Sequence, residues 1–191
     1  YLIAGRTNAT EEGIDEGGDR DKNGTFFKSF NGARIGIHPT DNSGIYFTYL
    51  HFEDDKDSIK VRKGATPDEN FVYSANGYIS LFSNMLLLGG EISHSKYNED
   101  VENAPDTIDD NAYRFFARSK IRDLELEFEH KRVDPNYRTN GNPYLQEDRD
   151  EWIAGISYRF SDAISTKFTY DTYEDNVNDR PDETTTRTDI Y

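Results

Sequence analysis

The stretch Tyr113–Val133, YRFFARSKIRDLELEFEHKRV, most constrains what this 191-residue chain can fold into. Charged and apolar side chains alternate along two runs, which is the period of a β-strand with two different faces. A two-residue turn at Ile121-Arg122 joins the runs into an antiparallel hairpin. Because a slip of one residue would mix the two faces, the alternation determines which side chains lie together.

One face of this hairpin is charged and the other is apolar. The turn sets basic residues opposite acidic ones, which stabilises a strand pair: Arg118 faces Glu125 and Arg114 faces Glu129. The other face gathers Tyr113, Phe115, Ala117, Leu126, Phe128 and His130. A charged inner face with an aromatic outer face indicates a membrane barrel, whereas the reverse indicates a soluble sheet protein.

The same alternation recurs along the whole chain, and no stretch has the ~20 apolar residues of a membrane-spanning helix. In one further hairpin, a three-residue turn places Ile156 opposite Phe168, Ala154 opposite Tyr170 and Ser157 opposite Lys167. Ten strands are predicted: Tyr1–Thr7, Phe30–His38, Ile45–Phe52, Phe71–Phe82, Met85–Lys96, Ala112–Lys120, Asp123–Val133, Glu151–Phe160, Ile164–Glu174 and Thr184–Tyr191.

The connections between these strands are sorted by length. The short ones contain the Pro, Asn, Asp, Ser and Gly of tight turns: Pro39–Gly44, Ser83–Asn84, Ile121–Arg122 and Ser161–Ala163. The long ones are polar and acidic: Asn8–Ser29, Glu53–Asn70, Tyr97–Asn111, Asp134–Asp150 and Asp175–Glu183. Short turns at one end of a sheet and long loops at the other are typical of outer-membrane barrels.

Composition excludes some classes of function. With 37 acidic and 22 basic residues the net charge is −15, which argues against nucleic acid as a partner. The chain has no cysteine, so it has no disulfide framework and no thiolate metal site. Its 13 Tyr and 12 Phe argue against a disordered acidic chain.

We expect residues 1–191 to form a single β-barrel domain, because no shift in composition divides the chain. The first and last strands have no flanking turn, so we expect strands cut at both ends and a segment of a larger barrel. Tyr1 in place of Met indicates a processed or cropped product.

The charged side chains of the inward-facing ladder are the best candidates for function. In a barrel they would line the lumen, where rings of charge tune which solutes pass. Alternatively, they pair with one another and make a polar interior tolerable, and the two roles are compatible. The ladder comprises Arg114, Arg118, Glu125, Glu127, Glu129, Arg159, Lys167 and Asp171.

A calcium site is a second candidate. The segment Asp19–Gly24, DRDKNG, matches the start of a calcium-binding loop, in which alternate oxygen ligands point to one centre. Asp19, Asp21 and Asn23 would be the ligands. Phe30 stands where a bidentate acid is expected, so the alternative is an acidic, solvated outside loop.

Catalytic residues are not predicted. Ser93 and His94 are neighbours, but adjacent residues of a strand point to opposite faces and cannot share a site. His130 and Asp134 form no specific catalytic pattern. We therefore expect a protein that is not an enzyme.

The overall pattern resembles bacterial outer-membrane β-barrels of the porin type. More specifically, Tyr158–Asp162, Tyr170–Asn176 and Arg180-Pro181 resemble hairpins of the large barrels that sheathe multihaem cytochromes in porin–cytochrome conduits. The resemblance implies a bacterial outer-membrane location, lipid and a multihaem cytochrome as partners, and no cofactor bound by this chain itself.

We therefore expect an all-β, antiparallel up-and-down transmembrane β-barrel with about ten strands present. Its expected function is a channel, or the structural sheath of an outer-membrane complex. The alternative is a secreted, soluble all-β binding or adhesion module whose aromatic face is packed inside. A hydrolase borne on a barrel is the third possibility.

Overall fold

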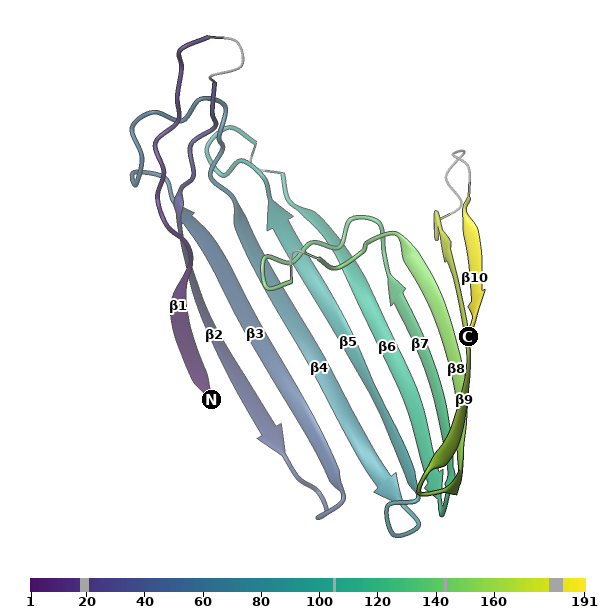
Figure 1. Cartoon of the computed structure of the whole chain (residues 1–191). Helices are drawn as coiled ribbons and strands as arrows, with labels where there is room; N and C mark the ends of the chain where they lie inside the picture. Colours follow the sequence, from purple (N-terminus) through teal and green to yellow (C-terminus); the bar gives the residue numbers. More distant parts are fainter. Residues whose placement is uncertain (18–20, 105, 143, 179–183) are drawn as a thin grey trace.

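A computed structural model describes residues 1–17, 21–104, 106–142, 144–178 and 184–191. These residues form one ten-stranded antiparallel sheet in which each strand pairs with its neighbours in sequence (Figure 1). The strands are β1 (Leu2–Asn8), β2 (Phe27–Ile37), β3 (Ser43–Asp55), β4 (Glu69–Leu81), β5 (Leu86–Asn98), β6 (Ile108–Ile121), β7 (Leu124–Val133), β8 (Arg149–Ser161), β9 (Ile164–Asp175) and β10 (Thr186–Ile190).

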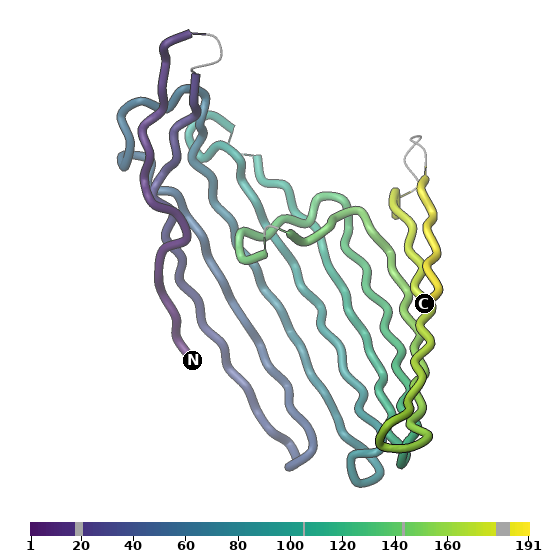
Figure 2. The backbone as a smooth tube through the Cα atoms, viewed as in Figure 1, coloured from purple at the N-terminus to yellow at the C-terminus, as the bar shows by residue number. Residues whose placement is uncertain are grey.

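The predicted all-β, up-and-down arrangement is confirmed, but the sheet does not close into a barrel. β1 pairs only with β2, and β10 pairs only with β9, so both remain open edges. The backbone trace shows the two edges standing apart across the curved sheet (Figure 2). Within the described residues, no helix is long and apolar enough to cross a membrane.

All ten predicted strands are present, and their ends differ by a few residues. A clear difference is in β6, which begins at Ile108 rather than Ala112. Asp109 pairs there with Lys96 and Asp110 with Ser95, so the ladder with β5 continues into a segment predicted to be loop. Acidic residues are poor strand formers in isolation, and the pairing overrides that preference.

The predicted turn of the β6–β7 hairpin is wrong by one residue. Ile121 stays in the strand opposite Leu124, and Arg122 takes a left-handed φ of 55°. The turn therefore uses Arg122 and Asp123, since β-branched Ile favours a strand whereas Asp favours a turn. Arg118 consequently faces Glu127 rather than Glu125.

One other hairpin keeps its predicted register. In β8–β9, Ile156 lies opposite Phe168 and Ser157 opposite Lys167, as predicted. In β4–β5, Leu81 lies opposite Leu86 on either side of the predicted turn. The β4–β5 turn is longer than predicted, because Phe82, Ser83 and Asn84 all take left-handed φ values.

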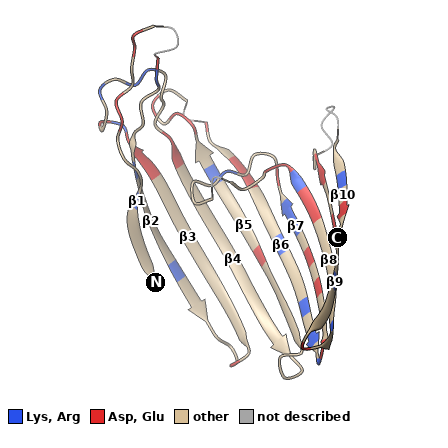
Figure 3. Ribbon diagram, viewed as in Figure 1, with Lys and Arg blue, Asp and Glu red and all other residues tan. Residues whose placement is uncertain are grey.

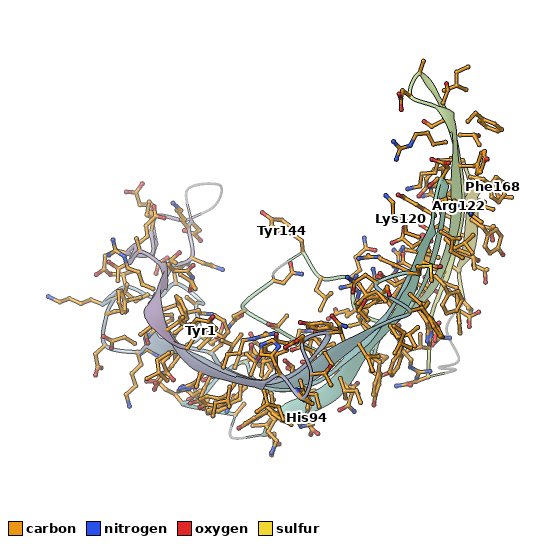
Figure 4. All side chains as sticks on the ribbon, turned by 90° about the horizontal axis from the view of Figure 1, so that it is seen from below. Tyr1, His94, Lys120, Arg122, Tyr144 and Phe168 are labelled. Carbon is orange, nitrogen blue, oxygen red and sulfur yellow. The ribbon has the colours of Figure 1, made fainter. Side chains whose placement is uncertain are left out.

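The sheet is curved, and its two faces differ in chemistry. Figure 4 shows Phe168 and His94 on the convex side and Lys120 and Tyr144 on the concave side. The strand registers place apolar residues on the convex face from one edge to the other, and many are exposed. Among them are Ile35, Phe47, Ile79, Ile92, Phe115, Phe128, Trp152, Ile156 and Phe168.

Charged side chains lie mainly in the loops and on β5–β10, as Figure 3 shows. The buried apolar core is small and lies on the concave side near the loop end. It comprises Phe26, Phe52, Ile59, Val72, Val133 and Tyr137. A sheet with so few buried apolar side chains leaves most of its hydrophobic surface open, which is unusual for a soluble monomer.

The long loops at one end bind one another. The β1–β2 and β3–β4 loops share backbone hydrogen bonds, from Gly13 N to Val61 O (2.6 Å) and from Gly24 N to Arg62 O (2.8 Å). A Cβ atom on Gly24 would lie 2.9 Å from Val61 O, so this close approach requires glycine. Arg62 also pairs with Glu102 of the β5–β6 loop. The loops therefore form one connected layer.

Candidate functional site

The register places all of the predicted ladder residues on the concave face of β6–β9. Arg114 donates to both oxygens of Glu129, at 3.0 Å from Nε and 2.7 Å from Nη2. Arg118 donates to Glu127 at 3.1 Å and lies 3.9 Å from Glu129. A bidentate guanidinium–carboxylate pair is among the stronger polar contacts in proteins.

The other ladder residues lie outside this cluster. Glu125 pairs with Lys120 at 2.5 Å, not with Arg118 as predicted, because the turn is displaced. Arg159 and Lys167 lie on β8 and β9 without an ion pair to the cluster in the described part of the chain. One carboxylate oxygen of Asp171 is buried without a hydrogen-bond partner among the described residues.

An aromatic ring separates the two arginines of the cluster. Phe116 has the guanidinium of Arg114 at 5.3 Å and that of Arg118 at 5.2 Å from its ring centre. A Cβ atom on Gly89 would lie 2.4 Å from the ring, so the ring covers a glycine on the next strand. The arrangement holds the arginines apart and directs them to their carboxylate partners.

The sequence analysis missed three charged residues of the concave face, namely Lys131, Arg149 and Glu151. Lys131 and Arg149 both pair with Glu151, which is only 5% exposed. The Arg149 guanidinium also lies 3.7 Å from the centre of the Tyr173 ring. Their alternation with His130 and Trp152, which lie on the convex face, could have shown that they belong to the charged face.

The strap, as we call residues 134–142 and 144–148, lies between β7 and β8 in the chain and crosses the concave face of the sheet (Figure 1). Tyr144 of the strap lies well inside the curve of the sheet (Figure 4). The sequence predicted an outside loop here. The strap instead turns inward, because side chains of the sheet offer it specific hydrogen bonds.

Two buried polar side chains of the sheet, Asn70 and Ser95, hold the strap. Asn70 and Ser95 are both 0% exposed. Asn70 donates to the carbonyl of Arg138 at 3.2 Å and accepts from the backbone N–H of Asn140 at 3.0 Å. The hydroxyl of Ser95 also bonds the Arg138 carbonyl. Buried polar groups of this kind are costly unless paired, so the strap and the sheet need each other.

Two further contacts extend this attachment. The Tyr137 hydroxyl bonds Ser93 at 2.7 Å, and burial raises the pKa of that phenol. Asn140 donates to Asp68 at 3.0 Å, and Lys28 bonds both oxygens of Asp68 at 2.7 Å. The strap is thus joined to β2, β4 and β5. Polar residues at buried strand positions were the available sequence signal.

A cavity of about 660 Å³ lies between the strap and the ends of β8 and β9. Its charged lining residues are Arg138, Glu147, Asp148, Arg149 and Asp175. Arg138 pairs with Glu147, Arg149 pairs with Glu151 outside the lining, and Asp148 accepts the backbone N–H of Val177 at 2.9 Å. The volume is that of an ordinary small-molecule site, and the lining contains three carboxylates and two arginines.

The predicted calcium ligands are only partly described. Asp19 lies outside the described residues. Asp21 accepts from Gly17 N at 2.7 Å and pairs with Lys63 at 3.0 Å, and the Lys63 hydrogen bond lowers the pKa of that carboxyl. Lys63 also binds Asp15 at 2.6 Å. A lysine ammonium is thus the cation beside Asp21, while the side-chain oxygen of Asn23 lies 3.7 Å from the Cβ position of Gly64, the residue after Lys63.

The residues considered for catalysis remain apart, as the alternation predicted. Ser93 is on the concave face with Tyr137, whereas His94 is on the convex face and contacts Asn111 at 3.0 Å. His130 contacts Asp150 at 2.9 Å rather than Asp134. Asp134 instead accepts from Arg132 at 2.8 Å.

The chain was compared with protein-family models, with curated proteins and with solved structures, and it matches none of them. Arg180-Pro181, part of the stretch that resembles porin–cytochrome barrels, lies outside the described residues. The chemistry of the site is therefore inferred from the geometry of its residues.

Proposed function

We propose that this chain is an arc of an outer-membrane β-barrel, with its convex face in lipid and its concave face lining a polar channel that the strap narrows. One observation carries the proposal: exposed apolar side chains cover the convex face while paired charges cover the concave face. A soluble sheet that buries one face would put its apolar residues on the covered side, and here the strap covers the polar side.

The height of the apolar surface supports a membrane. On β4 the convex face runs from Phe71 to Leu81, which is ten residue steps. At ~3.3 Å per residue and a typical barrel tilt of ~40°, this run spans roughly 25 Å, which is about the height of the apolar band of outer-membrane barrels. The tight turns lie at one end of the strands and the long acidic loops at the other (Figure 1).

Aromatic side chains near the limits of this surface also support the proposal. Tyr49 and Tyr73 lie 5.4 Å apart near the loop end, and Trp152 lies near the same end of β8. Tyr158 and Phe160 lie near the turn end, 4.8 Å apart. Aromatic rings flank the apolar band of barrels at both interfaces.

The open edges indicate how the barrel would be completed. In lipid, each unsatisfied backbone N–H or C=O group costs several kcal/mol, so spanning sheets close on themselves. β1 and β10 each leave one side unpaired among the described residues. Further strands, from the same polypeptide or from another subunit, would pair with these edges and make a larger barrel.

Trp152 is the only tryptophan and is 44% exposed on the convex face, so its fluorescence tests the proposal directly. The full chain is reconstituted into vesicles containing lipids brominated on their acyl chains. We expect strong quenching by the brominated lipid and weak quenching by aqueous acrylamide. The opposite result, in a chain that stays monomeric without detergent, would instead indicate the soluble binding module.

Conductance in a planar bilayer separates a channel from a sheath. An open channel gives stable ionic currents, and the polar concave face with its cavity near the strap supports this form. A sheath closed around a partner, such as the multihaem cytochrome implied by the resemblance, gives no current until the partner is removed.

A further inference from the structure

Three successive hairpins repeat one pattern at the loop end of the convex face. Each has a histidine on its first strand and a carboxylate on its second strand. The ring nitrogens lie close to the acid oxygens, at 2.9 Å, 3.8 Å and 2.9 Å: His51 with Glu69, His94 with Asp109 and His130 with Asp150.

The three hairpins differ in the charge of the residue two positions after the histidine. Lys96 lies directly opposite Asp109, and Arg132 lies directly opposite Asp150, so two of the hairpins place a basic residue against an acid. In the remaining hairpin, β3–β4, Glu53 lies directly opposite Glu69. Like charges in direct cross-strand contact destabilise a sheet, so this pair requires a compensating cation.

The neighbouring strands supply no such cation in the same row. Ser29 of β2 lies opposite Glu53, and Asn98 of β5 lies opposite Glu69. Arg6 stands beyond Ser29, about 10 Å from Glu53 at two strand spacings. Lys96 is diagonal to Glu69. In the described part of the chain, the side chain of Glu53 forms no hydrogen bond or ion pair.

Three side chains that can ligate a metal ion lie close together at this place. One ligand atom from each of His51, Glu53 and Glu69 can be chosen so that all lie within 4.8 Å of one another. The imidazole is held rigidly, because it stacks on Phe71 at 4.3 Å with 1° between the planes. The Asn31 side-chain amide lies 3.4 Å from Nδ1 of that imidazole.

We propose that His51, Glu53 and Glu69 bind a divalent transition-metal ion, with Zn²⁺ the best match. Imidazole nitrogen and carboxylate oxygen are both zinc ligands, and a fourth position stays open to water. The ion cancels the charge of the two carboxylates, where the other two hairpins place the basic residues Lys96 and Arg132 opposite an acid. The side chain of Glu53 is exposed and free to rotate inward until the ligand atoms are roughly 3.3 Å apart.

The Asn31 side chain beside the imidazole also fits this role. With the metal on Nε2, neutral His51 carries its proton on Nδ1, and metal-bound imidazoles give that proton to an oxygen acceptor. A rotation of the Asn31 amide by 180° would bring its oxygen to Nδ1, and the two amide orientations have the same shape. The site lies on the outer rim and does not depend on whether the concave face conducts solutes.

The test is a calorimetric titration of the metal-free full chain in detergent micelles with Zn²⁺, with Co²⁺ absorption as a second readout. We expect one equivalent to bind and to produce the spectrum of a nitrogen- and oxygen-ligated Co²⁺. His51→Ala and Glu69→Gln should weaken binding by at least about 10- to 100-fold. Absence of saturable binding in the folded wild-type chain would overturn the proposal.

The repeated pattern supplies matched controls. His130→Ala removes the equivalent histidine of β7, where Arg132 replaces the second acid, and should leave the Zn²⁺ affinity unchanged. Glu53→Lys should abolish Zn²⁺ binding and raise the melting temperature of the metal-free chain, because it restores the charge pairing of the other hairpins. Equal loss of affinity in the His130 and His51 variants, or a lower melting temperature for Glu53→Lys, contradicts the site.

Discussion

At the residue scale, the ion pairs of the concave face differ in their surroundings more than in their geometry. Glu129 has a side chain that is only 11% exposed, whereas the side chains of Lys120 and Glu125 are 60% and 51% exposed. Removing the partner of a buried carboxylate leaves an uncompensated charge, while exposed pairs are screened by water. The ladder is therefore not a row of equivalent contacts.

Arg114→Ala should lower the free energy of unfolding by about 1–3 kcal/mol, because Glu129 then loses a bidentate partner in a poorly hydrated place. Lys120→Ala should change it by less than about 1 kcal/mol, as expected for an exposed pair. Urea unfolding in the same detergent, followed through Trp152 fluorescence, measures both. Equal effects of the two substitutions would contradict the ranking.

At the element scale, the strap and the loop layer are held by different kinds of contact. Neutral hydrogen bonds from Asn70, Ser93 and Ser95 attach the strap, whereas ion pairs such as Arg62–Glu102 tie the loops. Neutral bonds do not respond to pH near neutrality, while carboxylate pairs weaken in acid. The attachment of the strap and the attachment of the loop layer should therefore respond differently to a change in pH.

Ser95→Val should release the strap, because the buried Arg138 carbonyl loses its hydroxyl partner and the larger side chain occupies its place. We expect faster proteolysis within residues 134–148 and a larger conductance if the chain forms a channel. Ser157→Val, on the concave face away from the strap, serves as the control. Unchanged proteolysis in the Ser95 variant would show that the strap does not depend on this contact.

Acid should loosen the loop layer before the sheet. The hydrogen bond from Arg62 holds the pKa of Glu102 below its ordinary value of 4.5. A lowered folded-state pKa contributes stability above the unfolded value, and this is lost as pH falls through the folded value. Hydrogen-exchange protection of the loops, corrected for intrinsic rates, should therefore drop below about pH 4.5. Glu102→Gln should remove that drop, and Glu99→Gln should not.

At the scale of the whole molecule, the two faces of the sheet are distinct environments. Adjacent residues of β8 lie in different environments, since Ile156 is on the convex face and Ser157 on the concave face. The proposed barrel assigns lipid to the first and a hydrated lumen to the second. Neighbouring positions in the chain should then respond oppositely to the same substitution.

Ile156→Arg should destabilise the chain in lipid bilayers by about 2–4 kcal/mol, the cost of an arginine near the midplane of a barrel's lipid face. Ser157→Arg should change stability by less than about 1 kcal/mol, because the lumen hydrates the guanidinium. Folding into vesicles, measured by urea titration and gel mobility, gives both values. A larger cost for Ser157→Arg would reverse the assignment of the faces.

The strand pattern could be predicted from the sequence because the side-chain period of two is local. Phe115 and Phe128 share a face with Trp152 in the structure, as alternation requires. The β8–β9 register also followed from the turn residues. The β6–β7 register did not, because the preference of Ile121 for the strand moved the turn to Arg122-Asp123.

Alternation and turn residues were enough to predict the number of strands, their order and which residues share a face, since these depend on neighbours along the chain. The folded sheet was needed to show that the apolar face is convex and that the strap turns inward to Asn70 and Ser95. It was also needed to show that Arg114 binds Glu129 diagonally rather than from a directly opposite position. Curvature and contacts between distant segments depend on the whole sheet. The hairpin Tyr113–Val133 therefore specified two faces, and the curvature assigned the charged one to the inside.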